Sequence, residues 1–165
     1  MKKRMIVWML AVLCMLLAVS CGEEPNEQSG LEPYSFTVDG VVFTPGADAG
    51  AVFAVWRGKA PQISVKASCL GGVDGEDVTY VYDGFRIQTF RSSEGEEIRW
   101  VILMSDVVTT SKGITIGSTV DQAKTTYGEP AETSDSLIVY QQGGTKLRFK
   151  HRDGVITAVE YTVSE

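Results

Sequence analysis

The residues in this sequence that could attack a substrate are one cysteine and one histidine. Cys69 is the thiol left in the folded part once Cys14 and Cys21 are assigned to an exported N-terminal segment, as argued below, and His151 is the sole histidine. A cysteine nucleophile needs a base close enough to take its proton. The alternating pattern places His151 on the inward side of its strand, so we interpret Cys69 as a small buried hydrophobe and His151 as a core histidine. We therefore predict that the protein is not an enzyme, with a Cys69-dependent enzyme as the distant alternative.

Two groups of carboxylates raise the question of a metal site. Asp74, Glu76 and Asp77 surround Gly75, but their order lacks the D-x-D-x-D-G pattern of a calcium-binding loop. We expect a polar, solvated loop over residues 71–77, and the same interpretation applies to the acidic residues between 94 and 97. The sequence also contains no Gly-rich phosphate loop, serine-nucleophile elbow or metal-ligand cluster. We therefore expect no cofactor.

A row of cations marks the candidate binding surface. Basic residues alternate strictly with inward-facing ones along the predicted strand 145–152, and these basic residues are Lys146, Arg148, Lys150 and Arg152. Such alternation is typical of a strand with one buried and one solvated face. Glu160 and Thr162 fall on the matching face of the next strand. The row is either an ordinary solvated face or, as we hypothesise, the place where an acidic protein partner docks.

The overall charge limits the class of partner. The chain has 15 basic and 21 acidic residues, and removal of an N-terminal segment carrying Lys2, Lys3 and Arg4 leaves the mature charge near −9. Binding to duplex nucleic acid depends on neutralising phosphates with lysine and arginine. We therefore expect no nucleic-acid partner.

Residues 1–20 have the pattern of a signal peptide. Lys2, Lys3 and Arg4 precede an unbroken apolar run of 15 residues from Met5 to Val19, which is shorter than the roughly 20 residues of a membrane-spanning helix. The end of the run, Ala18-Val19-Ser20-Cys21, resembles the bacterial lipobox, which implies that Cys21 is acylated and becomes the first residue of the mature protein. The alternative is an uncleaved N-terminal anchor with an incidental cysteine.

The segment that follows favours the lipoprotein interpretation. Residues 21–33 are polar and rich in glutamate, proline and glycine, a composition that suits a flexible tether between a lipid and a folded domain. Two acyl chains hold a protein firmly on a bilayer, whereas one chain binds only marginally. We therefore expect a protein anchored through acylated Cys21 to the extracytoplasmic face of the cell membrane.

The folded part contains one pattern twice. Segments 41–61 and 114–130 each run from a β-branched stretch through a glycine and a helical pattern to an aromatic residue, Trp56 or Tyr127, before a glycine and a proline. Self-similarity in a fixed order indicates a repeat. The chain therefore divides into repeat 1 over residues 34–106 and repeat 2 over residues 107–165, each predicted as a hairpin, a helix and a β-meander.

Periodicity predicts the elements of each repeat. We expect helices over 45–57 and 118–127, the second capped by Ser118 with Asp121 three residues on. We expect hairpins at Asp39-Gly40 and Lys112-Gly113. The remaining predicted strands cover 62–68, 78–83, 85–92, 97–105, 136–141, 145–152 and 155–163. Aromatic residues, including Trp100, are expected chiefly in the core, although some could line an open sheet face.

These elements predict an α+β fold. Short turns force successive strands to be antiparallel neighbours. Two tandem repeats would then share one antiparallel sheet and pack both helices on one of its faces. The other face would be left without a cover.

The motifs of the second repeat also resemble known families. Ile116-Gly117-Ser118-Thr119-Val120 and Tyr127-Gly128-Glu129-Pro130 resemble a signature of small lipoproteins of the outer-membrane assembly type. The tandem arrangement resembles the fold of beta-lactamase inhibitory protein, and the whole mature chain is similar to uncharacterised lipoproteins of Firmicutes. These resemblances imply an architecture, and no residue-by-residue match transfers the inhibitor's binding site.

Two non-enzymatic functions follow as expectations. The first is a surface-anchored module that binds another protein through the open face of its sheet. The alternative is a structural component of an envelope-assembly or cell-surface complex.

Overall fold

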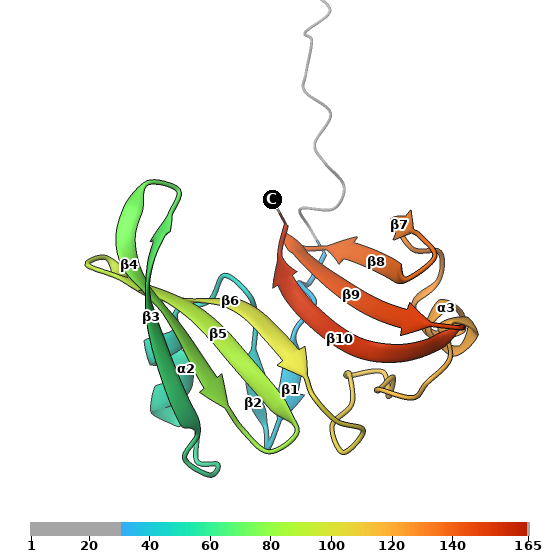
Figure 1. Ribbon diagram of the computed structural model, residues 1–165. Coiled ribbons are helices and arrows are strands. Elements are labelled where there is room, and N and C mark those ends of the chain that lie inside the picture. Colours follow the sequence, from blue (N-terminus) through green and yellow to red (C-terminus); the bar gives the residue numbers. More distant parts are fainter. Residues whose placement is uncertain (1–30, 165) are drawn as a thin grey trace, which may run out of the picture.

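The structure is a computed structural model, and it describes residues 31–164. The predicted signal peptide, Cys21 and most of the predicted tether lie outside the described residues. Figure 1 shows one large twisted sheet with two short helices and a small hairpin behind it. No helix within residues 31–164 is long and apolar enough to cross a membrane.

The large sheet has eight strands, all antiparallel, in the order β3-β4-β5-β6-β10-β9-β8-β7. Its first half contains β3 (Gln62–Leu70), β4 (Val73–Val81), β5 (Phe85–Ser92) and β6 (Gly95–Leu103). Its second half contains β7 (Glu132–Thr133), β8 (Leu137–Gln142), β9 (Thr145–Arg152) and β10 (Val155–Val163). The halves join where β6 pairs with β10, from Leu103 opposite Val159 to Trp100 opposite Thr162. The α+β class predicted from the sequence is therefore correct.

The core lies on one face of this sheet. Val78, Ile87 and Val101 come from the first half and Leu147, Phe149 and Tyr161 from the second, and all are buried in one cluster. The two helices, α2 (Ala49–Val55) and α3 (Val120–Tyr127), pack against this cluster.

Aromatic contacts fix the side on which each helix lies. The ring of Phe53 in α2 lies 4.6 Å from that of Tyr80 in β4, and the ring of Tyr127 in α3 lies 5.6 Å from that of Phe149 in β9. Strand register puts Tyr80 and Phe149 on the same face of the sheet. Both helices therefore cover the same face.

The N-terminal hairpin completes this cover. β1 (Phe36–Val38) and β2 (Val41–Phe43) form a separate two-stranded sheet around Asp39-Gly40, as predicted. Both turn residues have positive φ, 49° and 76°, the conformation that a two-residue hairpin requires. Phe36 and Phe43 are buried in the main core.

Both helices begin later than predicted. Gly46 N–H donates to Ile98 O at 2.7 Å and Ile98 N–H donates to Ala47 O at 3.0 Å, so residues just before α2 pair with the sheet and the helix starts after the N-cap Asp48. In α3 the N-cap is Thr119, which forms a capping box with Gln122. The predicted cap, Ser118, instead accepts a bond from Thr115 N–H.

Two predicted segments differ in the structure. Residues 71–77 are not a loop, because Gly71 and Gly72, with φ of 59° and 83°, form a tight turn and β4 begins at Val73. Residues 107–116 contain no strands: Thr110 N–H donates to Ile114 O at 2.8 Å, and the Thr110 hydroxyl accepts from Ile114 N–H at 3.0 Å. This side-chain bond closes a local turn in place of the predicted hairpin.

Candidate functional site

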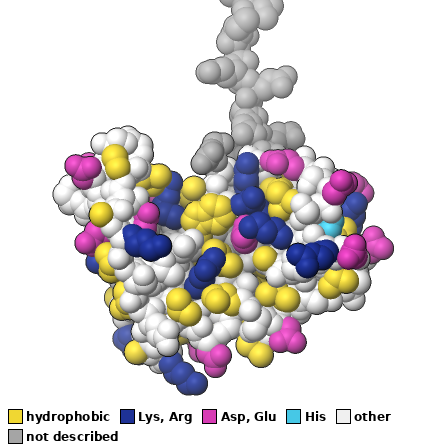
Figure 2. Space-filling model, in the orientation of Figure 1, with side chains coloured by type: hydrophobic (Ala, Val, Ile, Leu, Met, Phe, Trp, Pro, Cys, Tyr) yellow, Lys and Arg dark blue, Asp and Glu magenta, His cyan; other side chains and the backbone are white. Residues whose placement is uncertain are grey.

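The second face of the large sheet is open. Alternation turns one side chain in two away from the helices, and the described residues place neither helix nor the β1–β2 hairpin on that side (Figure 1). The space-filling view of this face shows apolar side chains at its centre with Lys and Arg side chains around them (Figure 2). A sheet face of this mixed character is a candidate interaction surface.

Three of the four predicted cations lie together on this open face. Lys146 stands opposite Thr162, and Arg148 stands opposite Glu160, so Glu160 and Thr162 lie on the same face as the cations, as expected from the sequence. Lys150 follows on the same side of β9. Arg152 is exposed at the end of the strand.

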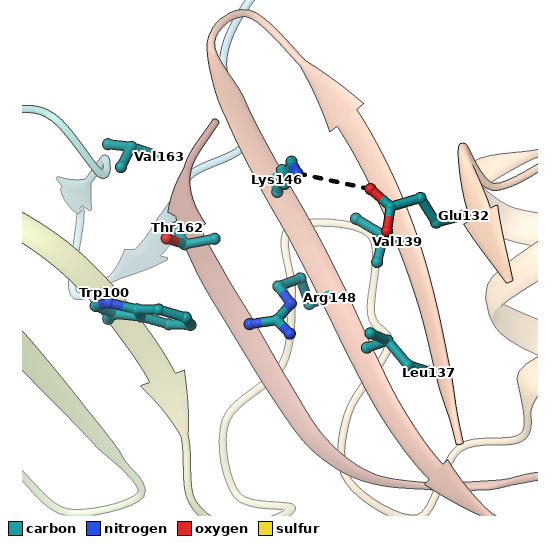
Figure 3. A pocket seen from close by; sticks show the side chains of 8 residues that line it. All are labelled: Trp100, Glu132, Leu137, Val139, Lys146, Arg148, Thr162 and Val163. Atoms are coloured by element: carbon teal, nitrogen blue, oxygen red, sulfur yellow. Dashed lines mark ion pairs between the residues drawn. The ribbon is translucent and has the colours of Figure 1, made fainter. Parts of the chain in front are cut away.

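The three cations Lys146, Arg148 and Lys150 are paired with carboxylates. Glu160, only 6% exposed, accepts bonds from Arg148 Nη1 at 3.2 Å and Lys150 Nζ at 2.6 Å. Lys146 Nζ lies 3.6 Å from Glu132 Oε1 (Figure 3). The two carboxylates belong to β10 and β7. The alternating pattern of β9 alone therefore could not predict that the cations of β9 are neutralised.

Trp100 of β6 lies beside this row at the joint between the two halves. It is half-buried on the open face, and the Arg148 guanidinium lies 5.5 Å from the centre of its ring (Figure 3). That geometry is a cation–π contact. The sequence did not identify Trp100 as a surface residue, because Trp100, Val101, Ile102 and Leu103 are all apolar and show no alternation.

Two hollows flank Trp100. The first, of about 240 Å³, is lined by Lys146, Arg148, Glu132 and Val139 among others. The second, of about 340 Å³, is lined on the first half by Lys66, Asp77, Gln88 and Arg99 among others. Both are also lined by Trp100, Thr162 and Val163, so they form one groove across the β6–β10 joint. We call this the central groove.

A polar cluster lies on the helix-covered face of the first half. Glu96 Oε1 accepts from the hydroxyls of Tyr80 at 2.7 Å and Thr89 at 2.5 Å, and Glu96 Oε2 accepts from Arg91 Nε at 3.0 Å. Burial favours the neutral carboxyl, but these bonds from Thr89, Tyr80 and Arg91 outweigh it and lower the pKa of Glu96. Burial and the bond to Glu96 raise the pKa of Tyr80 to about 12. The polar groups of this cluster bond to one another, so we interpret the cluster as a structural one.

The residues of the catalytic alternative do not meet. Cys69 is exposed on β3, opposite Asp74, so its predicted burial is wrong: β3 is the sheet edge, and neither α2 nor α3 covers this cysteine. His151 lies opposite Ile156 in β9, on the core side as predicted. Its two ring nitrogens are buried without a hydrogen-bond partner in the described part. Four strands separate β3 from β9, a gap of roughly 24 Å at about 4.8 Å per strand.

The acidic cluster of the sequence also fails to form a metal site. Asp74, Glu76 and Asp77 lie along β4, where successive side chains point to opposite faces. Glu76 is paired with Arg91 at 3.3 Å. Within residues 31–164 no group of three or more His, Cys, Asp or Glu side chains could hold a metal ion.

The comparisons with known proteins identify a similar fold and no family. No protein-family model matches the chain, and no curated protein matches it. A solved structure of a cysteine-rich secretory protein from Staphylococcus aureus is similar, with a TM-score of 0.52 and 11% sequence identity. The match covers 84% of this chain and 49% of that one, so this chain spans about half the length of the staphylococcal protein. At this identity the likeness concerns the fold alone.

Proposed function

We propose that this protein is a lipoprotein that is anchored to the extracytoplasmic face of the cell membrane and binds another protein, without catalysis, through the central groove. The observation that carries the proposal is Trp100, a half-buried indole between two hollows on a sheet face that no described element covers. Tryptophan and arginine are the residues most enriched at the energetic centres of protein interfaces. Here the two are in contact.

The groove favours an acidic partner. Its two hollows are lined by four cations, Lys66, Arg99, Lys146 and Arg148, against two carboxylates, Asp77 and Glu132. Outside the lining, Glu97 pairs with Arg99 and Glu160 pairs with Arg148. Each arginine has five N–H donors, and the ion pair with Glu160 uses one nitrogen of Arg148. The remaining donors are available to carboxylates of a partner. Because the rest of the chain is acidic, the groove is a place where the lining offers an acidic partner more cations than carboxylates.

The proposed anchor leaves the groove accessible. Residues 31–34 attach to the turn between β8 and β9: Gln142 Nε2 donates to Glu32 O at 2.6 Å, and Tyr34 N–H donates to the Thr145 hydroxyl at 2.6 Å. The folded domain therefore begins at one end of the sheet and not across its open face. Lipidation at Cys21, predicted from the sequence, would tether the domain from that end.

We also infer that the two halves of the sheet are tandem copies. Gly46 N–H donates to Ile98 O at 2.7 Å in the first half, and Gly117 N–H donates to Ile156 O at 2.8 Å in the second. Ile98 N–H and Ile156 N–H return bonds to Ala47 O and Ser118 O, respectively. In both cases the helix then follows directly. The central groove would then cross the interface between two copies, a place where binding sites are common.

The function is tested by capture with matched variants. The full chain, solubilised from its membrane, is used to capture proteins from the native envelope, in parallel with Trp100→Ala, Arg148→Glu and the control Val107→Ala. Val107 is 71% exposed and lies outside the groove. We expect a partner that the unaltered chain and V107A retain and that both groove variants lose by at least tenfold.

Two further outcomes are decisive. The affinity of the captured protein should fall between low and physiological salt, because exposed charges are screened beyond roughly 8–10 Å. Capture that does not depend on Trp100 or Arg148 would overturn the groove as the binding site. Loss of capture with Cys21→Ala but not with the groove variants would indicate that the anchor alone determines the association.

A further inference from the structure

The two edges of the large sheet differ in how they are protected. β7 closes the second half with only two residues, so beyond its pairing with β8 it offers little free backbone to a further strand. β3 closes the first half with nine residues, and eight of these nine are exposed. Figure 1 shows β3 at the outer margin of the sheet, with β4 as its one neighbour. A long, bare edge presents unpaired backbone N–H and C=O groups that can pair with a further strand.

Apolar side chains of β3 continue the apolar face of the sheet past the region that the helix covers. Ile63 stands opposite Tyr80 and Val65 opposite Val78, and both of these β4 residues are buried under the helix-covered face. Ile63 is nevertheless 60% exposed and Val65 is 47% exposed. The apolar face of the sheet thus continues one strand past the helix that shields it, and a strand added at this edge would cover it.

Charge opposes pairing at this edge only weakly. Lys66 is the one charged residue among residues 62–70. It lies on the open-face side, opposite Asp77 of β4, which compensates its charge. Natural edges that resist pairing carry charged side chains, above all lysine, or prolines or bulges. The pairing of β3 with β4 is regular from Gln62 to Leu70, the strand contains no proline, and Lys66 is its one protective residue.

We propose that β3 pairs with β3 of a second copy of this chain, so that two sheets join into one across a two-fold axis. The second copy is the occupant because the edge is self-complementary: in an antiparallel pair, the apolar and small side chains on one face of β3 meet apolar and small side chains of the copy. Head-to-tail pairing of β3 with β7 is excluded by the length of β7, so the contact closes as a dimer and cannot extend into a fibre. This contact uses the backbone of β3 and its apolar side chains, and not the Lys66 side chain, which lines the central groove.

The chemistry of the strand limits the register. A two-fold axis perpendicular to the joined sheet makes one residue face itself. Lys66 facing the copy's Lys66 would place like charges directly opposite, which is unfavourable. An axis at Val65 pairs Ile63 with the copy's Ala67, and an axis at Ala67 pairs Val65 with the copy's Cys69. Neither register sets Cys69 against itself, so the dimer does not require a disulfide.

The first experiment measures association of the full chain. Two differently tagged full chains are produced in the same cells, solubilised in detergent, and one tag is used to capture the other. We expect co-capture of the unaltered chain and of Cys69→Ser. Co-capture should fall at least tenfold when both copies carry Ile63→Lys and Val65→Lys, because four cations would then meet at the joint. The control Val107→Lys makes the same chemical change at a residue that is 71% exposed away from the edge and should have no effect.

The second experiment tests the same contact without the double lysine variant, which could lose binding because it fails to fold. Single cysteines are placed at Val65, Ala67 or Val107 in the Cys69→Ser chain, and the membranes are oxidised. We expect a disulfide-linked dimer from V65C or A67C, and not from V107C. The proposal is wrong if the unaltered chains do not co-capture, if the double lysine variant co-captures as well as the unaltered chain, or if neither edge position cross-links above V107C. Capture of a different protein at this edge, in place of a second copy, would overturn it as well.

Discussion

The two halves of the sheet contain similar elements but differ in their outermost strand. Each half is a helix laid on four strands, and each helix buries an alanine in the common core, Ala49 in α2 and Ala123 in α3. The second half ends in the two-residue strand β7, whereas the first half ends in the nine-residue strand β3. The longer edge strand of the first half leaves more unpaired backbone groups exposed than the short edge strand of the second half does.

Polar groups also separate the halves. In the second half a carboxylate, Glu160, is buried on the open face between two cations. In the first half the partly buried carboxylate is Glu96, which lies on the helix-covered face and accepts bonds from two hydroxyls and Arg91. The less exposed carboxylate therefore lies on the open face in the second half and on the helix-covered face in the first half. Four predictions test how far these differences extend.

The largest effect is expected in the core of the second half. Phe149 is fully buried and its ring lies 5.6 Å from that of Tyr127 and 6.0 Å from that of Tyr140. Phe149→Ala should destabilise the domain by about 3–5 kcal/mol, the usual cost of emptying a buried phenylalanine site. The measurement is urea unfolding followed by circular dichroism and by tryptophan fluorescence, since Trp56 and Trp100 both lie in the first half.

Because β6 and β10 share one core, the two probes should report the same lowered midpoint for F149A. If fluorescence kept the unaltered midpoint while circular dichroism lost part of its signal, the halves would unfold separately and the common core would not couple them.

Replacing the buried carboxylate of the second half, Glu160, should destabilise the domain more than replacing the more exposed carboxylate Glu97 of the first half. Glu160→Gln removes the charge that Arg148 and Lys150 share, and we expect a loss of about 1–3 kcal/mol because two cations are left facing a neutral group. The matched change is Glu97→Gln, in an exposed pair with Arg99 at 2.7 Å, where exposed pairs contribute about 0–1 kcal/mol. Equal losses in chemical denaturation would contradict the distinction between the two pairs.

The helix caps are expected to differ less. Thr119 accepts from Gln122 N–H, and the Gln122 side chain accepts from Thr119 N–H. Thr119→Ala should destabilise the domain by about 1 kcal/mol, and Asp48→Ala by a similar amount, because an N-cap replacement typically costs about 0.5–2 kcal/mol. Thermal unfolding of both variants measures this. An effect of T119A below the error of the measurement would show that α3 is held by Tyr127 and not by its cap.

The smallest effect is expected from Glu96→Gln, whose stability should differ from that of the unaltered chain only in its response to acid. The pKa of Glu96 is lowered in the folded state, so its contribution to stability is complete above the unfolded pKa near 4.5 and is lost as the pH falls through the folded pKa. The unaltered chain should therefore lose stability below about pH 4.5 more steeply than Glu96→Gln. Denaturation midpoints between pH 3 and 7 give the comparison. If the denaturation midpoints of the two chains fall in parallel as the pH is lowered, Glu96 does not contribute to the loss of stability in acid.

Much of the local structure follows from the sequence alone. The hairpin turns at Asp39-Gly40, Gly143-Gly144 and Asp153-Gly154 all have positive φ, and these residue types adopt that conformation at the lowest steric cost. The alternation of residues 145–152 correctly predicted which side of β9 is buried. Both helices were located to within a few residues, because spacing and stop signals act over one or two turns. These features depend on neighbours in the chain, which the sequence displays directly.

The candidate site was decided by tertiary structure. β6 and β10 are far apart in the sequence, yet their pairing sets Trp100 beside Arg148 and creates the central groove. The same pairing brings Glu160 between the cations of β9, and the order of strands leaves Cys69 on a bare edge. Short-range signals specify turns, caps and alternation because steric limits act between neighbouring residues. The order of strands depends on how the whole apolar surface is buried at once, and that depends on every element together.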